Sequence, residues 1–133
     1  GWGRSMNGLH LIADLYRCQC NTDLLVDRAT LETLCVDECG NAGLTPLGSY
    51  FYQFTDDADK PAGVTGTVVL AESHLAVHTW PETGDVTLDV YVCNFSRDNS
   101  DRARSVYDCI VTALKPLEIV AHQVTRGKIL QPA

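Results

Sequence analysis

The sequence predicts an α+β fold, a two-layer α/β sandwich in which two helices cover one face of a mainly antiparallel sheet. The chain has 133 residues, 45% of them hydrophobic, which is enough for one domain with its own core and too short for two ordinary domains. Six stretches have a strand-like pattern and two have helical spacing, in the order β-α-β-β-β-β-α-β. Short turns separate the middle stretches, and short turns favour antiparallel neighbours.

The N-terminal third predicts one strand and one helix. Gly8 to Tyr16 alternates leucine and alanine with other residues, the pattern of a strand with one face on a core. From about Asp27 to Gly40 apolar residues recur every three or four positions, so a helix is expected there, starting a few residues earlier. Cys35 and Cys39 lie one helical turn apart and are expected to be small core residues.

The middle of the chain predicts four strands in succession. An aromatic strand is followed by an acidic, proline-containing loop. A β-branched apolar run then predicts a central strand buried on both faces, and two further runs form a hairpin around a turn that contains Pro81 and Gly84. In order, the ranges are Thr45 to Phe54 for the first strand, Thr55 to Ala62 for the loop, then Val64 to Glu72, Leu75 to Trp80 and Val86 to Cys93.

The C-terminal part predicts an amphipathic helix and a last strand. Ser100 is the expected N-cap, Pro116 ends the helix, and Leu117 to Thr125 forms the strand. Because both helices can cover the same face of the sheet, the other face would be bare. A bare apolar face usually has a partner, so we expect at least a homodimer with its sheets packed together.

Charge and composition narrow the classes of partner. The net charge of -7, from 10 basic and 17 acidic residues, disfavours nucleic acid and anionic membranes and favours a cationic small molecule. We expect a cytoplasmic protein, because the sequence has neither a membrane span nor the apolar core of a signal peptide. The six cysteines are then expected to be free thiols, and no metal site is predicted. Residues 1–5 precede the only methionine, Met6, and are expected to be left over from expression, so the domain is 6–133.

Reactive side chains gather where the central strand ends. The apolar run leads directly into Glu72, Ser73, His74 and His78. A hairpin centred near residues 82 and 83 brings Cys93 beside Glu72 and Ser73, because cross-strand partners then sum to about 165 or 166. The sequence does not decide whether Cys93 and His78 share a face. Buried polar groups cost free energy unless they are paired, so the cluster needs a functional explanation.

Four interpretations of this cluster compete. His74 and His78 could hold a metal, but residues four apart on a strand lie about 13 Å from each other, too far to chelate one ion. Ser73, His78 and Asp89 could form a hydrolase triad, although no glycine-flanked nucleophile turn is present. The polar residues could also be ordinary strand-end residues. The fourth interpretation is self-processing, in which Ser73 attacks the preceding carbonyl of Glu72 and becomes a pyruvoyl group, an electrophile that can form a Schiff base with a substrate amine.

One family carries this pattern. The stretch from Glu72 to Glu82, ESHLAVHTWPE, resembles the processing site of prokaryotic S-adenosylmethionine decarboxylase proenzymes. The similarity extends to Gly63-Val64-Thr65-Gly66, to Cys93 and to Gly8-Leu9-His10-Leu11, and it covers nearly the whole chain. The resemblance implies autocatalytic cleavage between Glu72 and Ser73, which leaves a covalent pyruvoyl cofactor at position 73. It therefore predicts a pyruvoyl-dependent carboxy-lyase.

The resemblance also assigns roles to single residues. It implies that His78 assists processing and that Cys93 protonates the α-carbon of the substrate after carbon dioxide leaves. Thr65 stands where many relatives have serine and is expected to support processing. Substrate contacts are implied for Phe54 and Trp80, beside the adenine, and for Glu72 through its new terminal carboxylate. The product would be decarboxylated S-adenosylmethionine, the aminopropyl donor of spermidine biosynthesis.

Two alternatives stay open. The loop from Thr55 to Ala62 is longer and more acidic than in typical relatives, and Asp56, Asp57 or Asp59 could meet a distal ammonium or guanidinium group. The substrate would then be L-ornithine or L-arginine. The other alternative is an unprocessed relative that binds S-adenosylmethionine or a partner subunit without catalysis.

Overall fold

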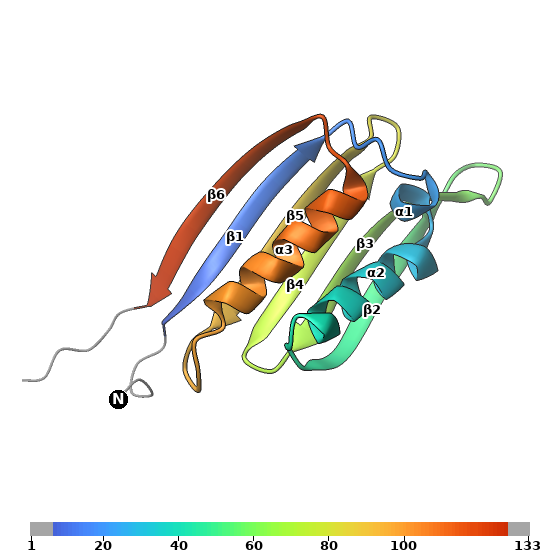
Figure 1. The fold of residues 1–133 in the computed structure, drawn as a ribbon. Helices are drawn as coiled ribbons and strands as arrows, with labels where there is room; N and C mark the ends of the chain where they lie inside the picture. The colour runs from blue at the N-terminus through green and yellow to red at the C-terminus, as the bar shows by residue number, and fades with distance from the viewer. Residues whose placement is uncertain (1–6, 128–133) are drawn as a thin grey trace, which may run out of the picture.

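A six-stranded antiparallel sheet forms one layer of the protein and three helices form the other (Figure 1). The computed structural model describes residues 7–127. Residues 1–5, which we expected to be left over from expression, lie outside this range. The predicted α+β class and element order are confirmed, with one short helix added. The elements are β1 (Asn7–Tyr16), α1 (Asp23–Val26), α2 (Arg28–Asn41), β2 (Pro46–Thr55), β3 (Pro61–Leu70), β4 (Ser73–Trp80), β5 (Asp85–Cys93), α3 (Ser100–Leu114) and β6 (Glu118–Gly127).

The strand order in the sheet is β2-β3-β4-β5-β1-β6. The four central strands of the sequence, β2 to β5, are neighbours joined by tight turns, as expected for successive hairpins. β1 lies between β5 and β6, so α2 and α3 belong to the connections that cross the sheet. The β4–β5 register pairs Ser73 with Val92, which confirms the predicted sum of 165.

Both long helices begin differently from the prediction. The side chain of Asp27 accepts a hydrogen bond from the Thr30 N–H at 3.0 Å and caps α2, so this helix starts at Arg28. The residues before it form the separate helix α1 instead of an earlier start of α2. At α3 the prediction of Ser100 as N-cap is wrong by one residue: Asn99 is the cap, and the Ser100 N–H donates to the Asp98 carboxylate at 2.9 Å.

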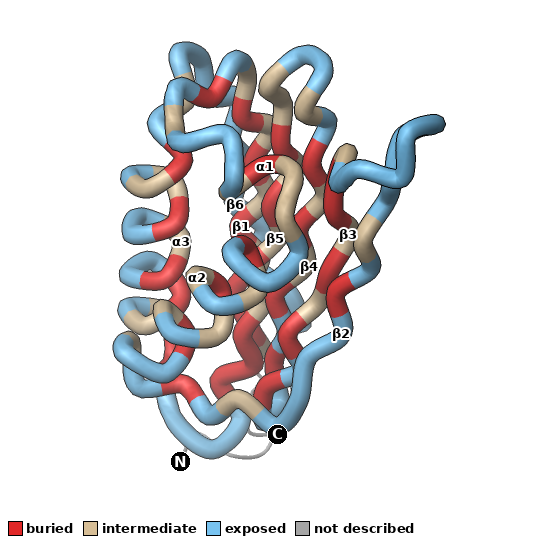
Figure 2. Tube along the Cα trace, turned by 90° about the vertical axis from the view of Figure 1, so that its right-hand side faces the viewer, coloured by how far each residue is buried: buried red, intermediate tan, exposed pale blue. Residues whose placement is uncertain are grey.

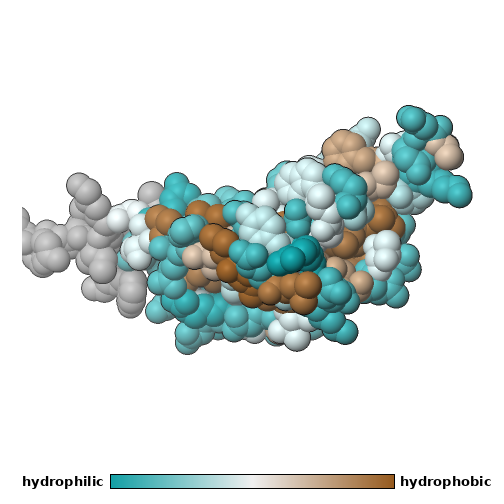
Figure 3. All heavy atoms as spheres, turned by 90° about the horizontal axis from the view of Figure 1, so that it is seen from above, coloured by the Kyte–Doolittle hydropathy of each residue, from teal (hydrophilic) through white to brown (hydrophobic). Residues whose placement is uncertain are grey.

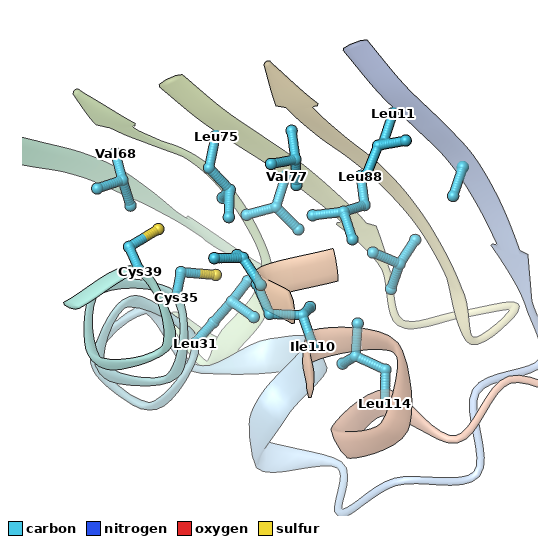
Figure 4. Packing of buried hydrophobic residues seen from close by; sticks show 14 of the residues in the cluster. Leu11, Leu31, Cys35, Cys39, Val68, Leu75, Val77, Leu88, Ile110 and Leu114 are labelled. Carbon is cyan, nitrogen blue, oxygen red and sulfur yellow. The ribbon is translucent and has the colours of Figure 1, made fainter. Parts of the chain in front are cut away.

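The core fills the space between the helices and the sheet (Figure 4). Cys35 and Cys39 are fully buried there, as predicted, and burial raises the pKa of Cys39 to about 11. All six cysteines are free thiols, also as predicted. The side chains drawn from α2 and α3 meet those of β1 and β3 to β5: Leu31, Cys35, Cys39, Ile110 and Leu114 on the helices, and Leu11, Val68, Leu75, Val77 and Leu88 on the strands.

The sheet face opposite the helices, called the open face below, has no covering layer in the described chain (Figures 1 and 2). Val69 on β3 is 48% exposed there, so within a single chain this central strand is buried on one face and not on both as expected. In β1, β3, β4 and β5 alternate residues point to this face, whereas their neighbours point to the core. Its exposed apolar side chains include Tyr50, Tyr52, Phe54, Val69 and Trp80.

The acidic segment is the connection between β2 and β3. Thr55 pairs with Pro61, so the loop proper is only residues 56–60, shorter than predicted. It projects past the end of the sheet that carries the β4–β5 turn and forms the hydrophilic arm at the right of Figure 3.

Candidate functional site

The bond between Glu72 and Ser73 lies at a strained turn. Leu70 pairs with Ser73, so only Ala71 and Glu72 connect β3 to β4. The sequence placed both residues in the strand, which was wrong, because the chain reverses there. Glu72 has a φ of 64°, the left-handed region, which costs a residue with a side chain about 1–2 kcal/mol.

Ser73 is the first residue of β4 and is 8% exposed. Its side chain points the same way as those of Leu75 and Val77, two and four residues along the strand, so it lies on the helix side of the sheet. The backbone N–H of Cys93 donates a hydrogen bond to the Ser73 Oγ at 3.4 Å. The structure therefore brings residues 73 and 93 together, as the hairpin register predicted.

The Cys93 side chain points the other way. On β5 the core-facing residues are Val86, Leu88, Val90 and Val92, so Cys93 belongs to the open face. The pKa of Tyr91 is raised chiefly by burial and further by the Cys93 thiol, which shares that face with it. The thiol is thus close to residue 73 along the backbone but on the opposite surface from the Ser73 hydroxyl.

Thr65 and His78 form a pair at the far end of the open face. Thr65 lies opposite His78 in the β3–β4 ladder, and the Thr65 Oγ1 is 3.1 Å from the His78 Nδ1. The His78 ring centroid lies 6.3 Å from that of Trp80. Phe54 pairs with Gly63 at this same end. Phe54 is 49% exposed and Trp80 is 43% exposed, so both aromatic rings are accessible.

The predicted site residues therefore fall into two groups. We call Glu72, Ser73 and Cys93 the cleavage-end group and Phe54, Thr65, His78 and Trp80 the aromatic-end group. Five residues of extended strand separate Ser73 from His78, about 16 Å. Their side chains are also on opposite faces of the sheet. His78 does share the open face with Cys93, but it lies opposite Thr87, six residues along β5 from Cys93.

Two rejected interpretations of the cluster can now be checked against the geometry. His74 and His78 both face the open side from β4, four residues apart. Within residues 7–127 no three His, Cys, Asp or Glu side chains gather closely enough to hold a metal ion. Ser73 and His78 are on opposite faces, so Ser73, His78 and Asp89 do not form a hydrolase triad.

A polar cluster beside Cys93 was missed by the sequence analysis. The Nε2 atom of His10 on β1 lies 3.3 Å from the Oδ1 atom of Asp89 on β5. The ring centroid of Tyr91 lies 6.1 Å from that of His10 and 5.3 Å from that of His74, and the Arg126 guanidinium lies 5.0 Å from the Tyr91 centroid. The cluster forms because β1 pairs with β5, which sets Gly8 opposite Cys93. No turn joins these two strands directly, so the turns in the sequence do not predict this pairing.

Burial is the main influence on the electrostatics of this cluster. It lowers the pKa of His74, and neighbouring His10 lowers it further, whereas Asp89 acts in the opposite direction. His74 is therefore favoured in its neutral form.

The acidic loop stabilises its own turn. The Asp56 Oδ1 accepts hydrogen bonds from the backbone N–H of Ala58 at 2.8 Å and of Lys60 at 3.0 Å. Asp59 has a φ of 62°, which also serves the turn. The Asp56 carboxylate is thus already engaged inside the loop, which weakens its assignment to the distal end of a substrate.

Comparisons with known proteins agree on one family. The model of the S-adenosylmethionine decarboxylase family matches residues 9–127. An S-adenosylmethionine decarboxylase proenzyme from Picrophilus torridus is 39% identical over 120 residues, covering 90% of this chain and 84% of the relative. One from Hydrogenobaculum is 37% identical, covering 92% of this chain and 83% of the relative. The crystal structure of the adenosylmethionine decarboxylase from Aquifex aeolicus superimposes with a TM-score of 0.82 at 34% identity, covering 98% of both chains.

Proposed function

Because the chain belongs to the S-adenosylmethionine decarboxylase family, we propose that it is a pyruvoyl-dependent carboxy-lyase that acts on S-adenosylmethionine. The observation that carries this proposal is the position of Ser73, a buried serine directly after a left-handed residue at a two-residue turn. The product, decarboxylated S-adenosylmethionine, donates aminopropyl groups in spermidine biosynthesis.

The proenzyme cuts itself between Glu72 and Ser73. The Ser73 Oγ attacks the carbonyl carbon of Glu72, and the nitrogen of residue 73 takes the hydroxyl proton, so an ester replaces the peptide bond. Loss of the α-proton of residue 73 then breaks its Cβ–Oγ bond and releases Glu72 as a carboxylate. One water molecule hydrolyses the remaining dehydroalanine and ammonia leaves. Residue 73 then begins the second fragment as a pyruvoyl group.

The position of Ser73 suits the formation of this group. Its hydroxyl is shielded from bulk water and held by the Cys93 N–H, next to a carbonyl whose residue is conformationally strained. The pyruvoyl group supplies an electrophilic carbonyl for the substrate amine and an electron sink for decarboxylation. Cleavage also breaks the covalent bond that joins residue 73 to the turn.

The chain's own residues then bind the substrate and handle the proton. Cys93 gives a proton to the α-carbon after carbon dioxide leaves, a role that a thiol can fill. The new C-terminal carboxylate of Glu72 contacts the substrate. Phe54 and Trp80 offer exposed aromatic faces to the adenine and to the sulfonium charge.

The separation of the two groups calls for a second copy of the chain. Within one chain His78 cannot approach Ser73, because five residues of extended β4, about 16 Å, separate them. We propose a homodimer in which the open faces pack together, so that the aromatic-end group of one copy meets the cleavage-end group of the other. The exposed aromatic residues of β2 support this arrangement, since burying them is favourable. Thr65 holds the His78 ring through its hydroxyl and thus supports processing.

The comparisons bear on the alternative substrates that the sequence left open. The relatives named above are S-adenosylmethionine decarboxylases, so ornithine and arginine are not favoured as substrates, and a non-catalytic role is not favoured either.

None of the helices within residues 7–127 combines the length and the apolar character needed to cross a lipid bilayer. We propose a cytoplasmic enzyme that binds neither nucleic acid nor membrane, in keeping with its net charge of -7.

Release of carbon dioxide tests this function. The purified protein is incubated separately with carboxyl-labelled S-adenosylmethionine, ornithine and arginine, and the labelled gas is counted. We expect release from S-adenosylmethionine only, and none from the Ser73→Ala protein. Release from ornithine or arginine alone would identify a different substrate, and equal release from Ser73→Ala would exclude a pyruvoyl mechanism.

A further inference from the structure

A second loop touches the cleavage turn from outside. We call residues 94–99, between β5 and α3, the clamp loop. The Ser96 Oγ of this loop donates a hydrogen bond to the Glu72 Oε2 at 2.9 Å. Glu72 is the residue with the left-handed φ of 64° and supplies the carbonyl of the scissile bond. One side chain of the clamp loop therefore holds the strained residue of the turn.

The clamp loop has a fixed base. Asn94 and Asn99 are 9% and 5% exposed, and both have hydrogen-bond partners. The Asn94 N–H donates to the Asn7 carbonyl at 2.7 Å, and the Asn99 N–H donates to the Asn94 Oδ1 at 2.8 Å. The Asn99 Nδ2 donates to the Cys93 carbonyl at 3.1 Å. Buried amides paired in this way restrict the loop, so Ser96 is presented from an ordered position.

A further contact joins the clamp loop to the other side of the turn. The Arg97 Nη2 donates to the Gly43 carbonyl at 3.0 Å, and the Ala71 N–H donates to the Thr45 carbonyl at 3.2 Å. A pocket of about 250 Å³ lies between these segments and is lined by Thr45, Ala71, Glu72, Ser96 and Arg97, among others. The turn is thus held from both sides next to an accessible pocket.

We propose that Ser96 is a positioning residue for self-cleavage. This inference rests on the proposed processing at Glu72–Ser73 and concerns its first step, formation of the bond between the Ser73 Oγ and the Glu72 carbonyl carbon. A non-glycine residue leaves the left-handed region readily unless its surroundings hold it. The hydrogen bond from Ser96 keeps Glu72 in that region and so keeps its carbonyl in place for attack.

The test measures the rate of cleavage of newly made protein. The 133-residue chain is translated in a cell-free system, and conversion into the two fragments is followed on denaturing gels over time. Ser96→Ala should cleave about threefold to tenfold more slowly than the unchanged protein, the factor expected for one lost hydrogen bond. Ser96→Thr keeps the hydroxyl and should restore most of the rate.

A double-mutant cycle separates positioning from general damage. If Ser96 acts through Glu72, then Ser96→Ala should have no added effect in a Glu72→Ala background. Ser49→Ala is the matched control, because the Ser49 Oγ donates to the Glu32 carboxylate at 2.8 Å between β2 and α2. It should leave the cleavage rate unchanged. Thermal melting of each variant identifies any loss of folding.

The outcomes distinguish this inference from the function on which it rests. If the unchanged protein never cleaves, the proposed function fails. If it cleaves and Ser96→Ala cleaves at the same rate, only the positioning role fails. Equal slowing by Ser96→Ala in the presence and absence of the Glu72 side chain would also overturn it, because Ser96 would then act by another route.

Discussion

The backbone N–H of Cys93 lies 3.4 Å from the Ser73 Oγ, whereas the Cys93 thiol lies on the opposite face of the sheet. Two different parts of Cys93 are thus available to the two stages of the reaction. The N–H contacts the nucleophile of the cleavage step, and the thiol faces the side where the substrate is proposed to bind.

Replacing Cys93 with alanine should therefore separate the two stages. Cys93→Ala removes the thiol but keeps the backbone donor, so cleavage at residue 73 should continue at a rate within a few-fold of the original. Decarboxylation should fall by about 10²-fold or more, as expected when a proton donor is lost. Gel analysis measures the first rate and carbon dioxide release the second. A variant that loses both equally would show that the thiol is needed for processing.

Mixed dimers test whether His78 acts across the interface. Chains carrying Ser73→Ala cannot be cut, and chains carrying His78→Ala should be cut slowly. When the two are co-expressed in equal amounts, about half of the His78→Ala chains should have a Ser73→Ala partner that supplies His78. Those chains should be cut at nearly the normal rate, which differently sized affinity tags would reveal. If His78→Ala chains stay uncut in the mixture, the partner does not supply His78.

The stability of the fold should depend on pH through His74. Its pKa in the folded protein is below the ordinary value of 6.5, so the unfolded chain binds protons more readily. The stability that neutral His74 contributes is present above about pH 6.5 and is lost as the pH falls through the folded pKa. Burial is the largest cause of the lowered pKa, His10 and Arg126 lower it further, and Asp89 opposes them. The Tyr91 ring packs against His74, with 5.3 Å between the ring centroids.

The fall in melting temperature between about pH 8 and about pH 5.5 should accordingly be smaller in His74→Gln than in the unchanged protein. His122→Gln is the control, because His122 is exposed on β6. If the pH-dependent fall in melting temperature became smaller by the same amount in both variants, His74 would not be the cause of the pH dependence.

A buried threonine should matter for stability rather than for catalysis. The Thr79 Oγ1 donates to the Leu25 carbonyl at 2.6 Å and accepts from the Val64 N–H at 2.9 Å, which ties α1 to the sheet. Thr79→Val keeps the shape but leaves both backbone groups unpaired, so unfolding should become about 1–3 kcal/mol easier. Chemical denaturation measures this change. Thr83→Val, at an exposed turn residue, should change stability by less than about 0.5 kcal/mol.

Local signals in the sequence predicted most of the fold. The turn around Pro81 and Gly84 fixed the β4–β5 hairpin, and with it the pairing of Ser73 and Val92. The turn at Ala71 and Glu72 was missed because neither residue is a usual turn former and Ala71 continues the apolar run of the strand. The chain reverses there because Leu70 pairs with Ser73, and the Glu72 carboxylate accepts a hydrogen bond from Ser96, a residue distant in sequence.

The division of the site residues into two separate groups could not be predicted from local sequence patterns alone. The distance from Ser73 to His78 follows from strand geometry alone. The face of each side chain depends on where the helices pack, and the cluster of His10, Asp89 and Tyr91 depends on β1 lying beside β5. Pairings between distant segments of this kind are set by the whole core, so no single stretch of sequence predicts them.

The most direct test of the central claim is the intact mass of the denatured protein after incubation with S-adenosylmethionine and cyanoborohydride, which traps imines. Self-processing predicts two fragments split between residues 72 and 73, with the substrate or its product attached to the fragment that begins at residue 73. The Ser73→Ala protein should remain one unmodified chain under the same conditions. A single uncleaved and unmodified chain from the unchanged protein would contradict the account.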